Sequence, residues 1–363
     1  MDVRKLRFTR VAAAVVAVLT LAACGTTQQA EPSDKQAEPA PTPSGPISVV
    51  ASINQWGSLA QEIGGDDVEV SSVLGSTAVD AHDFEPKTSD LTALSKADVV
   101  VVNGAGYDSW ATKVLSKDST LVSAADMVGA MEGDNPHLWF SKDARADMAQ
   151  ALADAFSKAR PKKAKAFASR LEDWQEEQKR VTDWMADFAK DHKDLTYAAT
   201  EPVAHYLMSD LGLSDVTPKG YAQAMASGGE VAPADLQDFQ RAIEGREAKL
   251  LVNNPQEASD ATNMLTGTAG RSDVPVLDVT EQMPSDVESL TAWIESLIDA
   301  LVGDVDPGYG TPSSPAEDDA DGESDSQMPS NEGQTDPGAT PSNEGQTDPG
   351  AVPSNEGQTD PGK

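Results

Sequence analysis

The strongest constraint on the fold is a stretch of about fifty residues, from Ser141 to His192, that carries no strand signal. Leu, Ala, Phe and Trp recur there at helical spacing among many charged residues. Because Pro161 is tolerated in the first turn of a helix, we expect one helix to end near Arg160 and a second to start there. The second would run about thirty residues, roughly 45 Å, which is long enough to span two lobes. Its apolar positions do not hold a heptad, which argues against a coiled-coil partner helix.

Strand and helix patterns alternate on both sides of this helical region. The predicted fold class is therefore α/β, with two lobes built on mainly parallel sheets and joined by one long rigid spanning helix. In such sheets the ligand groups usually follow the carboxyl ends of the strands. We expect strands at 47–53, 68–74, 98–104, 195–201, 248–255 and 274–281, and further helices at 54–65, 88–97 (capped by Thr88 or Ser89), 202–213, 232–247 and 285–302 (capped by Ser285).

The composition changes sharply at both ends of the chain. At the N-terminal end we expect a signal peptide at 1–23 and a lipid-anchored flexible linker at 24–46, and at the C-terminal end a disordered acidic repeat tail at 303–363. The strand and helix patterns divide the body between them into an N-terminal lobe at 47–141, a helical segment with the long linking helix at 142–192 and a C-terminal lobe at 193–302.

The first residues have the features of a secretion signal. A basic start precedes an apolar run from Val11 to Leu21, which is too short to span a membrane. The small residues before Cys24 resemble a bacterial lipobox, so we expect Cys24 to be lipidated and to anchor the protein on the outer face of the cell membrane. The alternative is an incidental thiol beside an ordinary cleavage site. As the only cysteine, Cys24 excludes an intramolecular disulfide.

The C-terminal region repeats the unit PSNEGQTDPGA from Pro329, Pro341 and Pro353. These repeats carry no apolar side chain that stacking could bury, so we expect a disordered, hydrated spacer rather than a solenoid. The whole chain has a formal net charge of −33. Such acidity argues against nucleic acid as a partner, because nucleic-acid binders need basic faces.

Two of the four histidines lie in polar loops that contain proline. His82 stands in VDAHDFEP and His137 in GDNPHLWFS. A lone histidine is more often a surface or structural residue, but two in one lobe favour a site for Zn, Mn, Fe, Ni or Cu. Asp80, Asp83 or Asp134 could accept the second ring N–H and so fix the tautomer.

Together these features resemble the metal-binding solute-binding lipoproteins of bacterial ABC importers for zinc and manganese (solute-binding protein family 9). The segment from VVASINQWG to VEVSSVL resembles the opening strand–helix–strand of that family, and AHDFEPKTSDLTALSKADVVVVNG resembles its first ligand loop with the following helix and strand. NPHLWFS, TEPVAHYLMSDLGL and VPVLDVTEQMP resemble the second, third and last ligand segments. The order of these segments, with a long helix between the second and third, is specific to the family.

The resemblance implies a ligand set. His82 and His137 match the two histidine ligands of the first lobe, and Glu201 matches the third ligand, where manganese-type members use Glu and zinc-type members usually have His. Glu281 is the best match for the final carboxylate, and Asp278 is the fallback.

Two imidazoles and two carboxylates accept Mn²⁺ or Fe²⁺ more readily than three histidines do, yet the Irving–Williams order still favours Zn²⁺ over Mn²⁺. The choice among zinc, manganese and iron therefore stays open. There is no His-rich loop after His82 of the kind seen in many zinc members. We expect His205 to lie at the surface, although it would share a helix face with Glu201 if that helix began early enough. We expect His192 to favour the C-terminus of the long helix electrostatically.

These implications describe an extracytoplasmic receptor, not an enzyme. As a monomer it would capture one divalent ion between its lobes, with small lobe motions, and deliver it to an ABC permease. The alternative is a surface adhesion lipoprotein that uses the acidic repeats and in which the metal site is structural. A metal-dependent hydrolase is disfavoured, because four protein ligands leave no open coordination position.

Overall fold

The computed structural model describes residues 45–79, 81 and 84–313. The predictions about the signal peptide, Cys24, the linker up to residue 44, His82 and the acidic repeats concern residues outside these ranges. None of the helices in the described part combines the length and the apolar character needed to cross a membrane.

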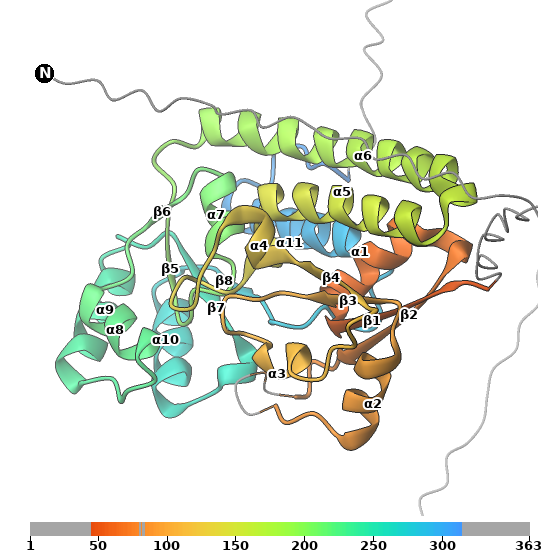
Figure 1. Cartoon of the computed structure of the whole chain (residues 1–363). Coiled ribbons are helices and arrows are strands. Elements are labelled where there is room, and N and C mark those ends of the chain that lie inside the picture. Colours follow the sequence, from red (N-terminus) through yellow and green to blue (C-terminus); the bar gives the residue numbers. More distant parts are fainter. Residues whose placement is uncertain (1–44, 80, 82–83, 314–363) are drawn as a thin grey trace, which may run out of the picture. The chain divides into compact units, whose positions relative to one another are not determined.

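The first half of the described chain forms a four-stranded parallel sheet with the order β2-β1-β3-β4 (Figure 1). The valines of β3 are all buried, as expected for a strand with both faces covered. The fourth strand was not predicted, because its sequence TLVS has only two apolar residues and half of it is exposed or partly exposed. The strands are β1 (Ile47–Ile53), β2 (Val68–Leu74), β3 (Val99–Val102) and β4 (Thr120–Ser123), and the helices are α1 (Asn54–Gly64), α2 (Thr88–Lys96), α3 (Ser109–Thr112) and α4 (Ala124–Val128).

A second parallel sheet, with the order β6-β5-β7-β8, follows later in the chain. The two sheets confirm the α/β class with parallel strands. Sequence reasoning missed β6, α8 and α10. The strands are β5 (Thr196–Ala199), β6 (Ser214–Asp215), β7 (Leu250–Asn253) and β8 (Val276–Asp278), and the helices are α7 (His205–Asp210), α8 (Lys219–Ala226), α9 (Pro233–Glu244) and α10 (Asp260–Arg271).

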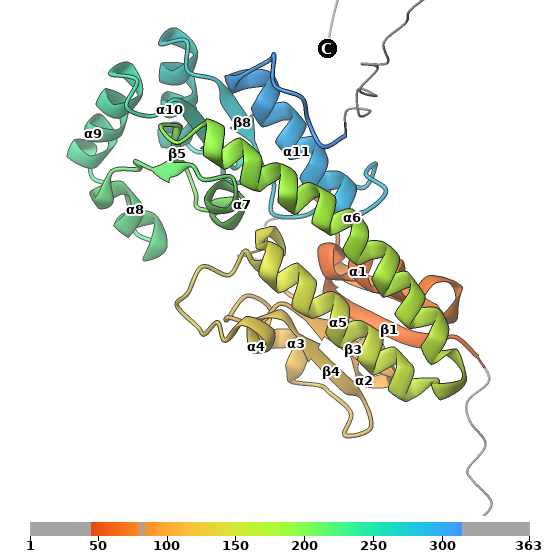
Figure 2. The same ribbon diagram turned by 90° about the horizontal axis from the view of Figure 1, so that it is seen from above.

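The helical region contains two long helices that lie side by side in both views (Figures 1 and 2). Helix α5 (Lys142–Ala159) ends before a short turn at Pro161–Lys163, and α6 (Ala164–Asp191) follows. The predicted break at Pro161 is therefore confirmed. Helix α6 has 28 residues, or roughly 42 Å at 1.5 Å per residue.

One expectation about α6 is wrong. Its buried positions alternate between spacings of four and three residues, which is a heptad spacing. Gln178 occupies one of these positions and interrupts the apolar pattern, and its Nε2 donates to Thr291 Oγ1 at 2.8 Å. The stripe packs against other helices of the same chain, including α1, α5 and α7. The buried residues are Phe167, Leu171, Trp174, Gln178, Val181, Met185 and Phe188.

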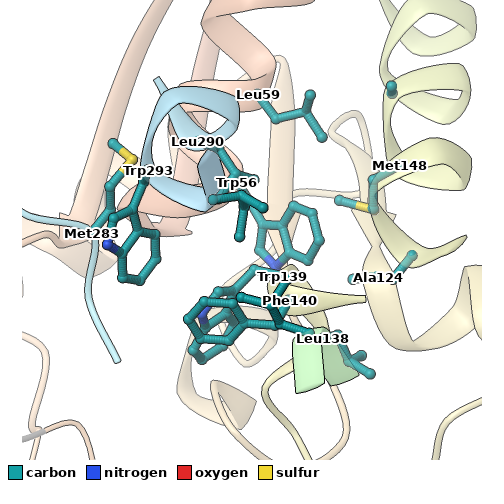
Figure 3. Close-up of a cluster of buried hydrophobic side chains, with 14 of the residues drawn as sticks. Trp56, Leu59, Ala124, Leu138, Trp139, Phe140, Met148, Met283, Leu290 and Trp293 are labelled. Atoms are coloured by element: carbon teal, nitrogen blue, oxygen red, sulfur yellow. The ribbon is translucent and has the colours of Figure 1, made fainter. Parts of the chain in front are cut away.

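The main hydrophobic core joins the first sheet to the last helix, α11 (Leu290–Val305) (Figure 3). Trp56 of α1 and Trp139 are fully buried in it. Phe140 packs against Trp293 of α11 with ring centroids 5.1 Å apart. Because Trp139 and Phe140 closely follow His137 in the chain, this core fixes the position of the segment that carries the histidine.

Two predicted helix caps are displaced in the structure. The N-cap of α11 is Ser289 rather than Ser285, and its side chain accepts from Ala292 N–H. The N-cap of α2 is Lys87 rather than Thr88 or Ser89, and Asp90 accepts the Lys87 N–H at 2.8 Å.

The folded part extends beyond the expected boundary at Val302. Helix α11 continues to Val305, and residues 306–313 contact α6. Trp184 Nε1 donates to Gly310 O at 2.8 Å, and the Tyr309 hydroxyl donates to Asp191 at 3.0 Å. His192 is the C-cap residue of α6, and its Nε2 lies 3.1 Å from Asp306 Oδ2. We call residues 306–313 the C-terminal strap.

Replacing Tyr309 should show what the strap contributes to stability. The Tyr309 ring packs edge-on against Trp184 and Phe188. Tyr309→Ala should lower the free energy of unfolding by about 1–2 kcal/mol, because it removes these half-buried contacts. Tyr309→Phe should cost less, since only the bond to Asp191 is lost. Urea unfolding measures both, and an Ala variant as stable as the parent would contradict a packed strap.

The half-buried carboxyl group of Glu62, between α1, α6 and α11, has a shifted pKa that predicts a pH-dependent stability. The pKa of Glu62 is raised from its ordinary 4.5 to about 7, mainly because the carboxyl group is shielded from water. The charge of nearby Glu177 contributes to the rise, and hydrogen bonds from Ser58 and the Leu290 N–H oppose it. The folded protein therefore holds this proton more tightly than the unfolded chain. Stability from this group is fully present below about pH 4.5 and is lost as the pH rises through 7.

Glu62→Gln should flatten this part of the pH–stability profile. The variant keeps the shape of the side chain but carries no charge, so at pH 8 it should be more stable than the parent by up to about 3 kcal/mol. Urea unfolding between pH 4 and pH 8 tests this, with the exposed Glu172→Gln as matched control. Parallel profiles for the Glu62 variant and the parent would contradict the prediction.

Candidate metal centre

Three of the four predicted ligands come together in one buried cluster. His137, Glu201 and Glu281 each offer one ligand atom, and these atoms lie within 4.8 Å of one another. The three residues are only 3%, 8% and 2% exposed, respectively. His137 Nε2 is 3.8 Å from Glu201 Oε1. The cluster therefore places one imidazole and two carboxylates around a single point.

The local fold explains why these side chains meet. Glu201 follows the carboxyl end of β5, and Glu281 follows that of β8. In the second sheet these two strands lie on opposite sides of β7. His137 lies just before the buried turn Leu138–Phe140. Strand ends of a parallel sheet share one edge, which is where the sequence pattern placed ligand groups.

Asn135 sets the orientation of the His137 ring. Its Oδ1 lies 2.8 Å from His137 Nδ1 and accepts the His137 backbone N–H at 3.0 Å. With Nδ1–H donating to this amide, the lone pair is on Nε2, the atom nearest Glu201. Asn135 Nδ2 also donates to Pro202 O at 2.7 Å, which ties this loop to the loop that carries Glu201. Asp134, one of the predicted partners of the ring, accepts the Met131 N–H instead.

Each carboxylate is held by a neutral donor. Asn254, which is 1% exposed, donates to Glu201 Oε2 at 2.7 Å. The Tyr107 hydroxyl donates to Glu281 Oε2. Burial first, and then the carboxylates of Glu281 and Glu201, raise the pKa of Tyr107, so the phenol stays protonated as a donor. The sequence did not predict that Asn254 and Tyr107 would hold the glutamates. The signal that could have pointed to them is that Asn254 follows β7 and Tyr107 follows β3.

The structure also places the two residues whose roles the sequence left open. Asp278 lies outside the cluster: it is exposed, and its Oδ1 accepts from Asn253 Nδ2 at 2.7 Å. His205 is the first residue of α7, so Glu201 is not on the same helix. The half-buried His205 ring lies 3.3 Å from the Tyr197 hydroxyl. The predicted ligand His82 is outside the described residues.

The loop that presents Tyr107 depends on a buried carboxylate. Asp108 is 1% exposed and accepts from the Ser52 hydroxyl and from the backbone N–H groups of Asn103 (2.6 Å) and Gly104 (2.8 Å). Gly104 has φ +80°, a conformation that favours glycine. The carboxylate thus fixes the turn that leads from β3 to Tyr107.

Asp108→Ala should destabilise the protein by about 3 kcal/mol, because it leaves three donors unpaired in the interior. Urea unfolding measures this loss, with Asp118→Ala as a matched control at an exposed position of the same lobe. If both variants unfold at the same urea concentration as the parent, the carboxylate does not fix this turn.

Solved structures and relatives identify the class of fold and then the family. The structure is similar to the periplasmic zinc binding protein TroA from Treponema pallidum, with a TM-score of 0.61 and 16% identity, covering 72% of this chain and 99% of that one. It is also similar to a Mn-bound periplasmic metal binding protein from Candidatus Liberibacter asiaticus, with a TM-score of 0.57 and 16% identity, covering 71% and 99%. At such identities the likeness shows the fold alone, which is that of periplasmic metal-binding proteins.

Residues 49–303 match the family described as zinc-uptake complex component A periplasmic, and the chain belongs to that family. The manganese-binding lipoprotein MntA of Bacillus subtilis is 29% identical over 184 residues, which cover 48% of this chain and 56% of that protein. The zinc-binding protein AdcA of Streptococcus pyogenes is 24% identical over 207 residues, covering 48% and 40%. The chain spans about half the length of the curated relatives it matches.

Proposed function

We propose that this protein is an extracytoplasmic receptor that captures a divalent transition metal ion, Zn²⁺ or Mn²⁺, and delivers it to an ABC permease. The observation that carries the proposal is the buried cluster of His137, Glu201 and Glu281, with ligand atoms within 4.8 Å of one another. Family membership supports it, because the named relatives include a manganese-binding and a zinc-binding protein.

The chemistry of the cluster suits a divalent cation as cargo. Two ionised carboxylates are costly to bury unless a positive charge compensates them. Asn254 and Tyr107 orient the carboxylates with neutral hydrogen bonds and add no positive charge. A divalent ion would balance both negative charges. Imidazole nitrogen with carboxylate oxygen accepts both zinc and manganese, with zinc held more tightly by the Irving–Williams order.

We assign His137, Glu201 and Glu281 as protein ligands. We assign His82 as the fourth ligand because of the sequence motif in which it lies. Asp278 is left out, since it lies outside the cluster and binds Asn253. Four protein ligands would leave no open position for a reacting water, which favours a receptor over a metal-dependent hydrolase.

Delivery to a permease and attachment to the membrane are the remaining parts of the proposal. A relative from Streptococcus parasanguinis is named a metal ABC transporter substrate-binding lipoprotein, and 30% of 115 aligned residues are identical. The lipobox-like sequence before Cys24 supports a lipid anchor on the outer face of the membrane. The receptor would act as a monomer, since a single chain supplies all the assigned ligands.

Contacts between the first sheet and the last part of the chain support small motions on metal capture. Asn54 Nδ2 donates to Met283 O at 2.6 Å, and Ser58 Oγ accepts the Leu290 N–H at 2.9 Å. Both bonds connect α1 to the segment between β8 and the start of α11. With α6 packed along α1 and α7, these bonds oppose wide hinge opening.

Elemental analysis of the full chain tests the proposal. After exposure to equimolar Mn²⁺, Fe²⁺ and Zn²⁺ and dialysis, the parent should keep about one equivalent of metal. His82→Ala, His137→Ala, Glu201→Ala and Glu281→Gln should each lose it. Removing a ligand should weaken binding at least as much as removing a residue that orients a ligand, which costs about 10–100-fold. Asp278→Asn is the matched carboxylate control and should keep the metal, as should His205→Ala. A parent that retains no metal would refute the proposed function.

A further inference from the structure

Gln256 has no part in the proposed ligand set, yet it contacts loops from both sheets. It lies in the turn Pro255–Glu257, just after β7. Its Oε1 accepts the Glu281 N–H at 2.7 Å. Its Nε2 lies 3.1 Å from Thr77 O and 3.2 Å from Val79 O. One side chain therefore connects the loop after β2 in the first sheet to the loop after β8 in the second.

The same amide belongs to a ring of hydrogen bonds that closes on Glu281. Gln256 Nε2 donates to Gln282 Oε1 at 2.8 Å, and Gln282 Nε2 donates to the Tyr107 hydroxyl at 3.1 Å. Tyr107 in turn donates to the Glu281 carboxylate. A third amide, Gln55, which is fully buried, donates to Glu281 O. Hydrogen bonds thus hold the backbone N–H, the backbone carbonyl and the carboxylate of Glu281.

We infer that Gln256 is a positioning residue that couples the loop at Thr77 and Val79 to the orientation of Glu281. The inference rests on the proposed function and adds a residue that acts on the metal through Glu281. The loop at Thr77 and Val79 supplies acceptors for the Gln256 amide, and the loop at Glu281 supplies a donor. Displacing either loop would leave these groups without their hydrogen bonds, which costs free energy in a partly buried network. Tight binding at Glu281 therefore requires the first-sheet loop to be in place.

The chemistry of the position favours glutamine. The side chain must accept the Glu281 N–H through its oxygen. Its two N–H hydrogens must at the same time serve Gln282 Oε1 and the neighbouring carbonyl oxygens of Thr77 and Val79, which share one hydrogen. Glutamate offers only acceptors when ionised and lysine offers only donors, so neither makes both sets of bonds. Methionine has nearly the same length and makes neither set.

The test compares Gln256→Met with the parent in the full chain, with Zn²⁺ and Mn²⁺ as separate ligands. Loss of a residue that orients a ligand typically weakens metal binding 10–100-fold, and we expect this loss to appear mainly as faster dissociation. The visible spectrum of the Co²⁺-loaded variant should differ from that of the parent. In the metal-free protein, the Glu281 amide should exchange its hydrogen faster, because its acceptor is gone.

Gln178→Met is the matched control. Gln178 is another glutamine at an internal contact, but its bond joins α6 to Thr291 of α11. This variant should unfold at a lower temperature and should keep the metal affinity and the Co²⁺ spectrum of the parent. Equal weakening of metal binding in both variants would reduce Gln256 to a general stability role and overturn the inference.

The remaining outcomes separate the inference from the proposed function. A parent that binds one equivalent of metal, beside a Gln256→Met variant with affinity within twofold and an unchanged Co²⁺ spectrum, would overturn the inference alone. A parent that binds neither Zn²⁺ nor Mn²⁺ would overturn the proposed function and this inference with it.

Discussion

The burial of two glutamates beside one histidine is the constraint on which the rest of the site depends. Charged carboxylates lose several kcal/mol of hydration when buried, and hydrogen bonds or an opposite charge must offset that loss. Glu201 and Glu281 receive hydrogen bonds from an amide and a phenol, which orient them without changing their charge. Such a site is arranged for a cation, and under the proposed function that cation is the cargo.

Rigid packing behind the site keeps these charged groups at fixed positions. The turn after His137 is anchored in the main core, where Phe140 meets Trp293 of α11. Helix α6 lies along α1 and α5, and the C-terminal strap covers part of its outer surface through Trp184 and Tyr309. The two halves of the chain share this core. Gln256 is the side chain we single out as a link between the loops of the two sheets, because it contacts both.

Much of the fold could be predicted from local patterns. Buried parallel strands are near-continuous apolar runs, and β3, with four valines, is the clearest example. The break at Pro161 follows from the chemistry of proline. Elements with weak local patterns were missed. Two of the four residues of β4 are polar. Helix α10 is rich in threonine and glycine, so burial against the second sheet stabilises it more than local propensity does. The heptad spacing of α6 was hidden because a glutamine fills one buried position.

The sequence by itself determined the family resemblance, the parallel α/β architecture and the candidate residues of the site, because motifs and periodic patterns depend on residues close together in the chain. Only the tertiary structure decided which carboxylate near the end of β8 enters the cluster: Glu281 lies within it and Asp278 faces solvent. It also decided which neutral side chains hold the ligands. Tyr107 and Glu281 are 174 residues apart, and such a pair meets only when two sheets pack together, so no local pattern records the contact.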